Sequence, residues 1–334
     1  RGLVMGVAND KSIGWGIAKA IADQGGEIAF TYQGEALKKR VIPLADSVNS
    51  DIVLPCDVSN DEDIDNTFNE LKKKWPKIDF LVHAIAFSDK DELKGEYVDT
   101  SRENFINTMD ISVYSFTAIA RRASIMMPDG GSLLTLSYYG AEKVMPHYNV
   151  MGLAKSALEA SVRYLSTDLG KDQIRVNSIS AGPIKTLAAS GIGDFRYILK
   201  WNEYNSPMKR NVTLDDVGGC GVYLLSDLSA GVTGETHHVD CGYHVVGMKA
   251  IDAPDMSQEK KEKLIEYCTE RFGISEKIFE KYQLYEGSKN KIYLIKELLE
   301  LRFTPESSGL CIFRFDKTPK PTTNFLQLFS AAIS

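Results

Sequence analysis

Residues 2–20 read GLVMGVANDKSIGWGIAKA: a short apolar run, then a glycine-containing loop, then the start of an amphipathic helix. This order is typical of the first unit of a parallel α/β sheet that binds a phosphate-bearing ligand. Gly14 and Gly16 would let the backbone approach a phosphate, and the N-terminus of a helix offers unpaired N–H groups. The spacing departs from G-x-G-x-x-G, because seven residues separate Gly6 from Gly14. One of them is Ser12, whose hydroxyl can donate to a phosphate.

The alternation of short apolar runs and longer amphipathic segments continues to about residue 250. Strands are predicted at 2–7, 27–32, 51–56, 79–85, 132–137 and 174–180. Helices are predicted at 14–24, 35–48, 61–74, 102–126 and 148–169. Strand–helix alternation on this scale indicates a parallel sheet covered by helices on both faces. A doubly wound, Rossmann-like α/β fold is therefore predicted.

Composition places the chain among ordinary globular proteins. It has 334 residues, of which 43% are hydrophobic and 25% are charged. Its apolar runs are far shorter than the ~20 residues that a membrane-spanning helix needs. The net charge of −6 disfavours nucleic acid as a partner. Neither a membrane protein nor a nucleic-acid-binding protein is therefore expected.

The five cysteines are scattered and never form a C-x-x-C pair. This pattern argues against a disulfide framework and favours a reducing, cytoplasmic compartment. His237, His238 and Cys241 lie close together in the sequence. They alternate around Val239 as in a short strand, and the chain offers no second pair of ligands, so no metal site is expected.

The sequence pattern changes beyond residue 250. Ala253-Pro254-Asp255 resembles a linker. Residues 256–334 carry 13 Lys and Arg against 11 Asp and Glu, although the whole chain has a net charge of −6. We therefore expect a Rossmann-like domain at 1–252 and a small α/β module at 256–334. Because the first residue is Arg1 and a strand begins at once, we also expect the natural N-terminus to lie upstream.

The end of the second predicted strand, Thr31-Tyr32-Gln33, is where a dinucleotide-binding fold contacts the adenosine ribose. It has neither the acidic residue of the usual fingerprint nor an adjacent Lys or Arg for a 2′-phosphate. Gln33 can hydrogen-bond a hydroxyl but cannot balance a phosphate dianion, so NADH is predicted in preference to NADPH. Asp57, after the third strand, is placed to reach the adenine. The alternative is that Asp57 caps the helix that follows.

Two tyrosine–lysine pairs could handle a proton, and both lie in YYGAEKVMPHYNVMGLAK (138–155). Tyr139 and Lys143 have the i, i+4 spacing of residues that share a helix face. Gly140 and Pro146 would interrupt a helix at this point, so a loop is predicted there and Lys143 is expected to be solvated.

Tyr148 and Lys155 stand at the start of a long amphipathic pattern that ends near Gly170. Seven residues turn a helix by about 700°, so the two side chains fall on one stripe and can share one ligand. The alternative is an ordinary surface pair at this spacing. The apolar face of this helix is expected to carry Leu153, Ala157, Leu158, Val162 and Leu165.

Several motifs together resemble one family. They are GVANDKSIGWGIA (6–18), HAIAF (83–87), YYGAE (138–142) with the Tyr-x6-Lys pair, SAGPIKTLAASGI (180–192) and LSDLSAGVTGE (225–235). In this order they resemble the NADH-dependent enoyl-[acyl-carrier-protein] reductases of bacterial fatty acid synthesis, over essentially residues 1–250. The resemblance implies a short-chain dehydrogenase/reductase fold, a homotetramer, NADH as cofactor and an enoyl thioester of acyl carrier protein as substrate. Of the two pairs, Tyr148 and Lys155 match the family.

In this family, hydride from NADH adds to C3 of the trans-2-enoyl thioester and leaves enolate charge on the thioester oxygen. The resemblance implies that Tyr148 donates to that oxygen, that Lys155 binds the nicotinamide ribose, and that Tyr138 is a second catalytic tyrosine. The expected cofactor-binding residues are Gly6, Ser12, Ile13, Gln33, Asp57, Val58, Ile85, Lys155 and Ile184. The expected substrate-binding residues are Ala86, Tyr138, Met151, Ile192 and Phe195.

Two other functions stay open. A carbonyl-reducing short-chain dehydrogenase would share the fold and cofactor but would use Tyr-x3-Lys on the helix. An RNA-associated protein would use the reductase fold only as a scaffold, because residues 256–334 resemble the small domain that precedes a PUA RNA-binding domain in archaeal RNA-modifying proteins. A natural fusion, an engineered joining or a misassembled gene would each place such a module there, and no catalytic role is expected of it.

Overall fold

The computed structural model of the chain describes residues 1–187, 195–254 and 256. Contacts between residues divide the chain into two units, Arg1–Ile251 and Asp252–Ser334. The first unit contains nearly all of the described residues. The module expected at 256–334 lies outside the described residues except for Met256, so its α/β character and its role stay predictions.

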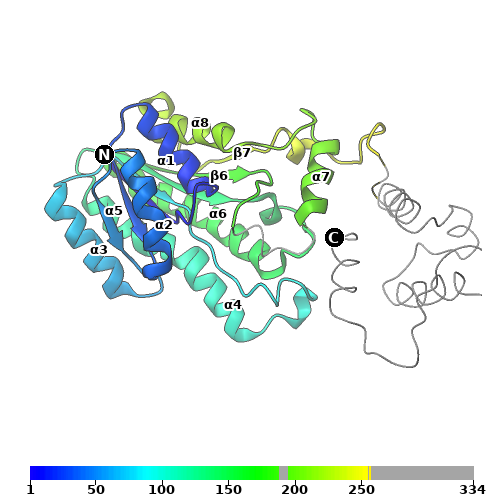
Figure 1. Cartoon of the computed structure of the whole chain (residues 1–334), viewed down its shortest axis with the longest axis horizontal. Coiled ribbons are helices and arrows are strands. Elements are labelled where there is room, and N and C mark those ends of the chain that lie inside the picture. The colour runs from blue at the N-terminus through cyan, green and yellow to red at the C-terminus, as the bar shows by residue number, and fades with distance from the viewer. Residues whose placement is uncertain (188–194, 255, 257–334) are drawn as a thin grey trace, which may run out of the picture. The chain divides into compact units, whose positions relative to one another are not determined.

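A seven-stranded parallel sheet forms the centre of the first unit (Figure 1). Its strands are β1 (Gly2–Met5), β2 (Ile28–Tyr32), β3 (Val53–Pro55), β4 (Phe80–His83), β5 (Gly131–Ser137), β6 (Ile174–Ala181) and β7 (Thr236–Val239). They lie in the order β3-β2-β1-β4-β5-β6-β7, so the direction of the order reverses between β1 and β4. In such a sheet, ligands bind at this reversal, outside the carboxyl ends of the strands.

Helices cover both faces of the sheet. They are α1 (Ile13–Asp23), α2 (Gly34–Ser47), α3 (Asp61–Lys74), α4 (Arg102–Met109), α5 (Ser115–Ile125), α6 (Asn149–Leu169), α7 (Phe195–Asn205) and α8 (Leu214–Leu225). Apolar side chains of α1, α2 and α8 form one buried cluster with the sheet, and those of α3, α5 and α6 form another. The predicted doubly wound, Rossmann-like fold is therefore confirmed. Among the helices that the structure describes, none combines the length and the apolar character needed to cross a membrane.

Helices α1 and α8 lie side by side on the same face of the sheet (Figure 1). Gly16 lies against Leu214, and a Cβ on Gly218 would come within 2.8 Å of the Gly16 carbonyl oxygen. A Cβ on Gly14 would come within 3.0 Å of the Ala84 side chain. The missing side chains of Gly14 and Gly16 therefore let α1 approach α8 and the loop after β4, which is a packing role that the sequence analysis did not predict.

The long helix predicted at 102–126 is interrupted. A π turn, Asp110–Tyr114, separates α4 from α5. Within it, the hydroxyl of the fully buried Ser112 donates to the Phe87 carbonyl oxygen and accepts from the Phe87 N–H, both at 3.0 Å. The π turn thus ties this helix pair to the loop after β4. Hydrophobic periodicity cannot reveal a bulge of this kind, which is common at functional sites.

Helix α6 begins at Asn149, one residue later than predicted. Leu158 and Val162 are fully buried on its apolar face, as expected. Leu153 is 39% exposed, which corrects its expected place on that face, and Ala154 is buried instead. The buried side of α6 therefore differs from the predicted one. It includes Lys155, which periodicity alone would assign to the polar side.

Candidate active site

Tyr148 stands directly before the first helical residue of α6. Its side chain is buried, and its ring meets the Tyr138 ring edge-on, with the ring centroids 5.0 Å apart. Burial raises the pKa of both phenols above the usual value. Both are therefore protonated at neutral pH and can donate a hydrogen bond to a ligand.

The backbone on either side of Tyr148 is unusual. His147 has a φ of 56° and Asn149 a φ of 36°, a conformation that L side chains rarely adopt. The Asn149 amide supports it by donating to the carbonyl oxygens of Glu92, at 3.1 Å, and Gly95, at 2.9 Å. The loop after β4 is thereby fixed to the neighbour of Tyr148. Asn149 was not among the residues predicted from the sequence, although asparagine tolerates positive φ better than most residues and stands beside the candidate tyrosine.

Gly140 makes room for the Tyr148 ring. A Cβ at this position would collide with the ring carbon Cδ1, and a Cβ on Gly152 would come within 2.9 Å of the Gly140 carbonyl oxygen. The short 3-10 turn Tyr139–Ala141 can therefore lie directly against the first turns of α6. These two glycines thus set the position of Tyr148 relative to the end of β5.

Lys155 lies about two turns further along α6 and is 5% exposed. Its ammonium group donates to the Leu136 carbonyl oxygen in β5 at 2.7 Å. Burial lowers the pKa of Lys155 to about 8, against the opposing effect of the Glu159 carboxylate. Glu159 itself accepts a hydrogen bond from the Ser137 hydroxyl. Because an ammonium group has three N–H donors, Lys155 can hold this contact and still bind ligand hydroxyls.

Tyr139 and Lys143 do not share a helix. Tyr139 begins the 3-10 turn before α6, and Lys143 is exposed. The buried Tyr139 donates its hydroxyl to the His244 carbonyl oxygen at 3.2 Å, which is a structural contact. The prediction that this pair lies outside a helix and that Lys143 is solvated is confirmed.

The start of α1 has neither a side-chain cap nor an acidic first turn. The Ser12 hydroxyl accepts from the N–H groups of Ala8 and Asn9, at 3.0 and 3.1 Å, and makes no cap on the helix. Among the described contacts, none satisfies the N–H groups of Ile13 and Gly14, and the first turn of α1 has no acidic residue. Helices α3, α4 and α8 instead begin with side-chain caps and acidic first turns. The start of α1 therefore suits an anion such as a pyrophosphate.

Gln33, after β2, is hydrogen-bonded to Asp57, after β3. The Gln33 amide donates to the Asp57 carboxylate at 2.9 Å, and Asp57 also accepts from the Ser59 N–H and hydroxyl. The cap of α3 is Asn60, whose side chain accepts from the Glu62 N–H. The alternative that Asp57 caps this helix is therefore wrong.

The remaining candidate cofactor residues also follow the carboxyl ends of strands. Gly6 comes after β1, Val58 after β3, Ile85 after β4 and Ile184 after β6. Gly6 has a φ of 92°, and a Cβ there would collide with the Ala84 carbonyl oxygen. Glycine is required at this point because β1 turns sharply beside the loop after β4. Parallel strands thus bring all four positions to one edge of the sheet.

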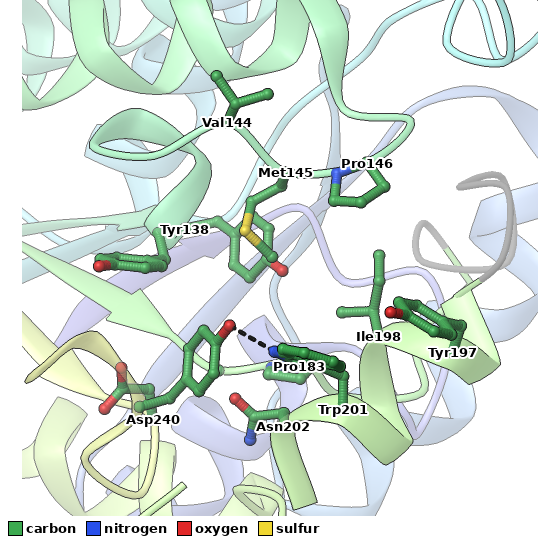
Figure 2. A pocket seen from close by; sticks show the side chains of 13 residues that line it. Tyr138, Val144, Met145, Pro146, Pro183, Tyr197, Ile198, Trp201, Asn202 and Asp240 are labelled. Atoms are coloured by element: carbon green, nitrogen blue, oxygen red, sulfur yellow. Dashed lines mark hydrogen bonds between the residues drawn. The ribbon is translucent and has the colours of Figure 1, made fainter. Parts of the chain in front are cut away.

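Met151, a candidate acyl contact, is buried beside Tyr148 in a small apolar cluster that includes Leu93. Tyr138 and Met145 pack against this cluster. A cavity of about 240 Å³ adjoins it, and both Tyr138 and Met145 line that cavity (Figure 2). The structure therefore brings the predicted tyrosines and Met151 together beside an open volume.

The other candidate acyl contacts are not seen to line this cavity. Phe195 is the half-buried first residue of α7, and it does not line this cavity. Ala86 is exposed in the loop after β4. Ile192 lies outside the described residues. The residues of α7 that do line the cavity were not singled out from the sequence; they are Tyr197, Ile198, Trp201 and Asn202.

His83 is a buried titratable side chain near Lys155 that the sequence analysis also missed. It ends β4, and its ring nitrogens lie 3.1 Å from the Thr135 hydroxyl and 2.9 Å from the Ser115 hydroxyl. Burial, together with the charge of Lys155, lowers the pKa of His83 to about 3. A neutral histidine with both nitrogens bonded joins β4, β5 and α5 and therefore has a structural role.

Comparison with known proteins identifies the relationship. Residues 6–244 match the family model described as enoyl-(acyl carrier protein) reductase. The chain belongs to this family. The reductase is 71% identical over 257 residues to "Enoyl-[acyl-carrier-protein] reductase [NADH] 1" of Rhizobium meliloti (strain 1021), covering 77% of this chain and 94% of the relative. It is 56% identical over 251 residues to the NADH enoyl-[acyl-carrier-protein] reductase FabI of Rickettsia typhi, covering 75% and 96%.

Solved structures share the fold of the reductase. The enoyl-(acyl-carrier-protein) reductase of Anaplasma phagocytophilum, in complex with NAD, has a TM-score of 0.73 and 64% identity, covering 76% of this chain and 95% of that one. The Bacillus cereus enzyme, in complex with NADP+ and an indole naphthyridinone, has a TM-score of 0.73 and 51% identity, covering 74% and 97%.

Two histidines near the end of the reductase domain, His238 and His244, pair with carboxylates. His238 of β7 lies 2.7 Å from the Glu142 carboxylate, and its ring stacks on His244 with the centroids 4.0 Å apart. His244 in turn lies 3.0 Å from the Asp240 carboxylate. Within the described residues, no three His, Cys, Asp or Glu side chains converge in a way that could hold a metal ion.

Proposed function

We propose that the reductase reduces the trans-2 double bond of enoyl thioesters carried on acyl carrier protein. The observation that carries this proposal is the joint burial of Tyr148 and Lys155 on α6, with Tyr138 edge-on to Tyr148. When bound, NADH supplies the hydride that adds to C3 of the enoyl group. The start of α1 would hold its pyrophosphate, and Gln33 with Asp57 would hold its adenosine.

Tyr148 acts on charge that appears only during the reaction. When C3 of the substrate receives hydride, negative charge develops on the thioester oxygen. A phenol already in place at this oxygen donates a hydrogen bond that strengthens as the charge grows, so it lowers the barrier more than it favours substrate binding. The raised pKa of Tyr148 keeps it in the donating, neutral form.

Lys155 orients the cofactor. Its bond to Leu136 holds the ammonium group at the end of β5, where remaining N–H donors can bind the nicotinamide ribose hydroxyls. The same cation lies in a buried environment, where charges interact more strongly than in water. Lys155 therefore contributes to cofactor binding and to the electrostatics around Tyr148.

The test compares two thioesters with NADH: crotonyl, which offers a carbon–carbon double bond, and acetoacetyl, which offers a ketone. We expect NADH to be oxidised with crotonyl thioester and hardly at all with acetoacetyl thioester. The opposite preference would identify a carbonyl reductase. The structure disfavours that alternative, because Lys143, the partner in the Tyr-x3-Lys spacing, lies outside α6.

We also propose that copies of the reductase form the homotetramer expected of the family. Ile125 at the end of α5 is 72% exposed, and Tyr164 on the neighbouring α6 is 76% exposed. Exposed apolar side chains on adjacent helices are typical of a surface that another subunit covers. Sedimentation equilibrium should give four times the chain mass, and an active monomer would contradict the proposal.

The cytoplasmic location is likewise our proposal. It rests on the family and on Cys56, Cys220 and Cys241, which are free thiols in the described part of the chain. An RNA-associated role would depend on residues 256–334, which lie outside the described residues. A salt-sensitive complex of the full chain with RNA would support that second function.

A further inference from the structure

In the described part of the chain, the cavity beside Tyr138 has no occupant in the proposed function. Figure 2 shows it enclosed by the loop before α6, by the segment after β6 and by α7. Its lining is Tyr138, Tyr139, Val144, Met145, Pro146, Gly182, Pro183, Tyr197, Ile198, Trp201, Asn202, Asp240 and Tyr243. The Tyr138 ring contacts the Tyr148 ring and also lines the cavity, so one side chain links the cavity to the candidate catalytic tyrosine.

Several polar groups in the cavity wall are already bonded to the protein. Asp240 accepts from the N–H groups of Gly242, at 2.9 Å, and His244, at 2.8 Å. The Asn202 amide donates to Asn211 at 3.2 Å. With these groups engaged, the cavity presents mainly aromatic rings and aliphatic side chains to its occupant. Such a lining favours an apolar ligand.

Two aromatic side chains close one wall of the cavity. The Trp201 indole N–H donates to the Tyr243 hydroxyl at 2.8 Å, so the polar atoms of both rings satisfy each other. The Tyr197 ring stacks on Trp201, with the centroids 6.0 Å apart. The Tyr139 ring meets Tyr243 edge-on, with the centroids 5.8 Å apart. This wall is therefore braced from both sides, and Figure 2 shows it facing Met145 across the cavity.

We propose that this cavity holds the distal part of the acyl chain and that the Trp201–Tyr243 pair sets the maximum chain length. This inference rests on the proposed function, because it places the thioester beside Tyr148 and Tyr138. An alkyl chain fits the apolar lining, because burying its methylenes there removes apolar surface from water. Further methylenes would have to displace two hydrogen-bonded rings, so chains beyond the capacity of the cavity lose rate.

The test measures kcat/KM with NADH for crotonyl, octenoyl, dodecenoyl and hexadecenoyl thioesters. Trp201→Ala removes the indole and opens the wall. We expect the ratio of hexadecenoyl to crotonyl kcat/KM to rise about tenfold or more, because only the longer chain uses the added space. Tyr243→Phe keeps the ring and loses only the hydroxyl, so we expect it to raise the same ratio by about two- to threefold. Trp201→Leu takes the place of Trp201→Ala if the alanine variant does not fold.

An unchanged ratio in a folded Trp201 variant would overturn the inference, and so would an equal loss on all four substrates. Failure of the unaltered enzyme on crotonyl thioester would instead overturn the proposed function. The two failures are therefore distinguishable. The KM for NADH should stay constant in every variant, because neither residue lies at a candidate cofactor position.

Discussion

The Gln33 amide donates to the Asp57 carboxylate at 2.9 Å and so links the ends of β2 and β3. Any 2′-phosphate on an adenosine ribose held at this point would meet a carboxylate instead of a cation. Lys38, a nearby lysine, lies over the Tyr32 ring and pairs with Glu35 at 3.2 Å. The site is therefore electrostatically suited to a ribose hydroxyl.

The first prediction follows for cofactor choice. We expect kcat/KM with NADH to exceed that with NADPH by at least about tenfold, which corresponds to ~1.4 kcal/mol. Asp57→Asn removes the carboxylate charge and should lower the ratio of kcat/KM with NADH to kcat/KM with NADPH. Steady-state kinetics with both cofactors measure this ratio. Equal kcat/KM values of the unaltered enzyme for NADH and NADPH would contradict the electrostatic argument. Measuring both cofactors matters here, because the Bacillus cereus relative was solved with NADP+.

The second prediction concerns Tyr148. Tyr148→Phe removes the donor to the developing enolate and should lower kcat by about a hundredfold to a thousandfold, with the Kd for NADH unchanged. Tyr139→Phe is the matched control, because it keeps the ring and removes only a hydroxyl that donates to the His244 carbonyl oxygen. The result is read from kcat and from cofactor titration. If Tyr139→Phe proved the more damaging change, the assignment of the tyrosine would be wrong.

The third prediction uses the titration of Lys155. Burial lowers its pKa to about 8. As the pH rises through 8, the ammonium group of the free enzyme loses its proton and its charge, so NADH affinity should fall. Lys155→Met should bind NADH weakly and should lose this pH dependence. Lys143→Ala, at an exposed position, should retain both the affinity and the pH dependence.

Lys155 also affects the stability of the fold. Raising the pH should weaken NADH binding through Lys155 but should increase its contribution to the free energy of unfolding. Its pKa of about 8 in the folded chain lies below the ordinary value of 10.5, so the unfolded chain binds more protons between these values. The contribution of Lys155 to the free energy of unfolding should therefore increase as the pH rises from 8 toward 10.5. Denaturant unfolding of the enzyme and of Lys155→Met across this range measures the difference. Identical pH profiles would show that the lysine is not buried in solution.

The fourth prediction concerns Gly140. In Gly140→Ala the new methyl group collides with the Tyr148 ring, which must shift. We expect a loss of about 1–3 kcal/mol in stability and a fall in kcat larger than any change in the Kd for NADH. Gly170→Ala is the control, because a Cβ there meets no atom within 4 Å. Equal stability and equal kcat in the two variants would show that the Tyr148 ring can shift without loss of stability or activity.

The fifth prediction concerns the boundary expected near residue 252. A chain ending there contains the whole sheet and should hold its core unaided, since about 250 residues bury most of their apolar surface. It should keep its NADH-dependent activity and its oligomeric state. Loss of activity with the fold intact, seen by circular dichroism, would mean that residues 256–334 contribute to the acyl site.

Much of the architecture could be predicted from local patterns. Strand and helix periodicities repeat over short windows, and β–α alternation with short loops permits few arrangements, so the doubly wound sheet followed from them. The exclusion of a helix between Tyr139 and Lys143 was equally local, whereas the choice of Tyr148 and Lys155 came from the resemblance to the family. Gly140 and Pro146 disfavour a helix between Tyr139 and Lys143, and the structure has only a short 3-10 turn, Tyr139–Ala141, at this point.

The sequence by itself thus indicated the doubly wound sheet, six of its seven strands, the family and the candidate pair Tyr148 and Lys155. Only the tertiary structure decided what surrounds that pair. Asn149 reaches Glu92 and Gly95, Trp201 bonds to Tyr243, and Ser112 holds Phe87. These partners are far apart in the chain, and one sequence carries no signal for pairing between distant side chains. Periodicity depends on neighbours along the chain, whereas an active site depends on which strand ends and loops the folded sheet brings together.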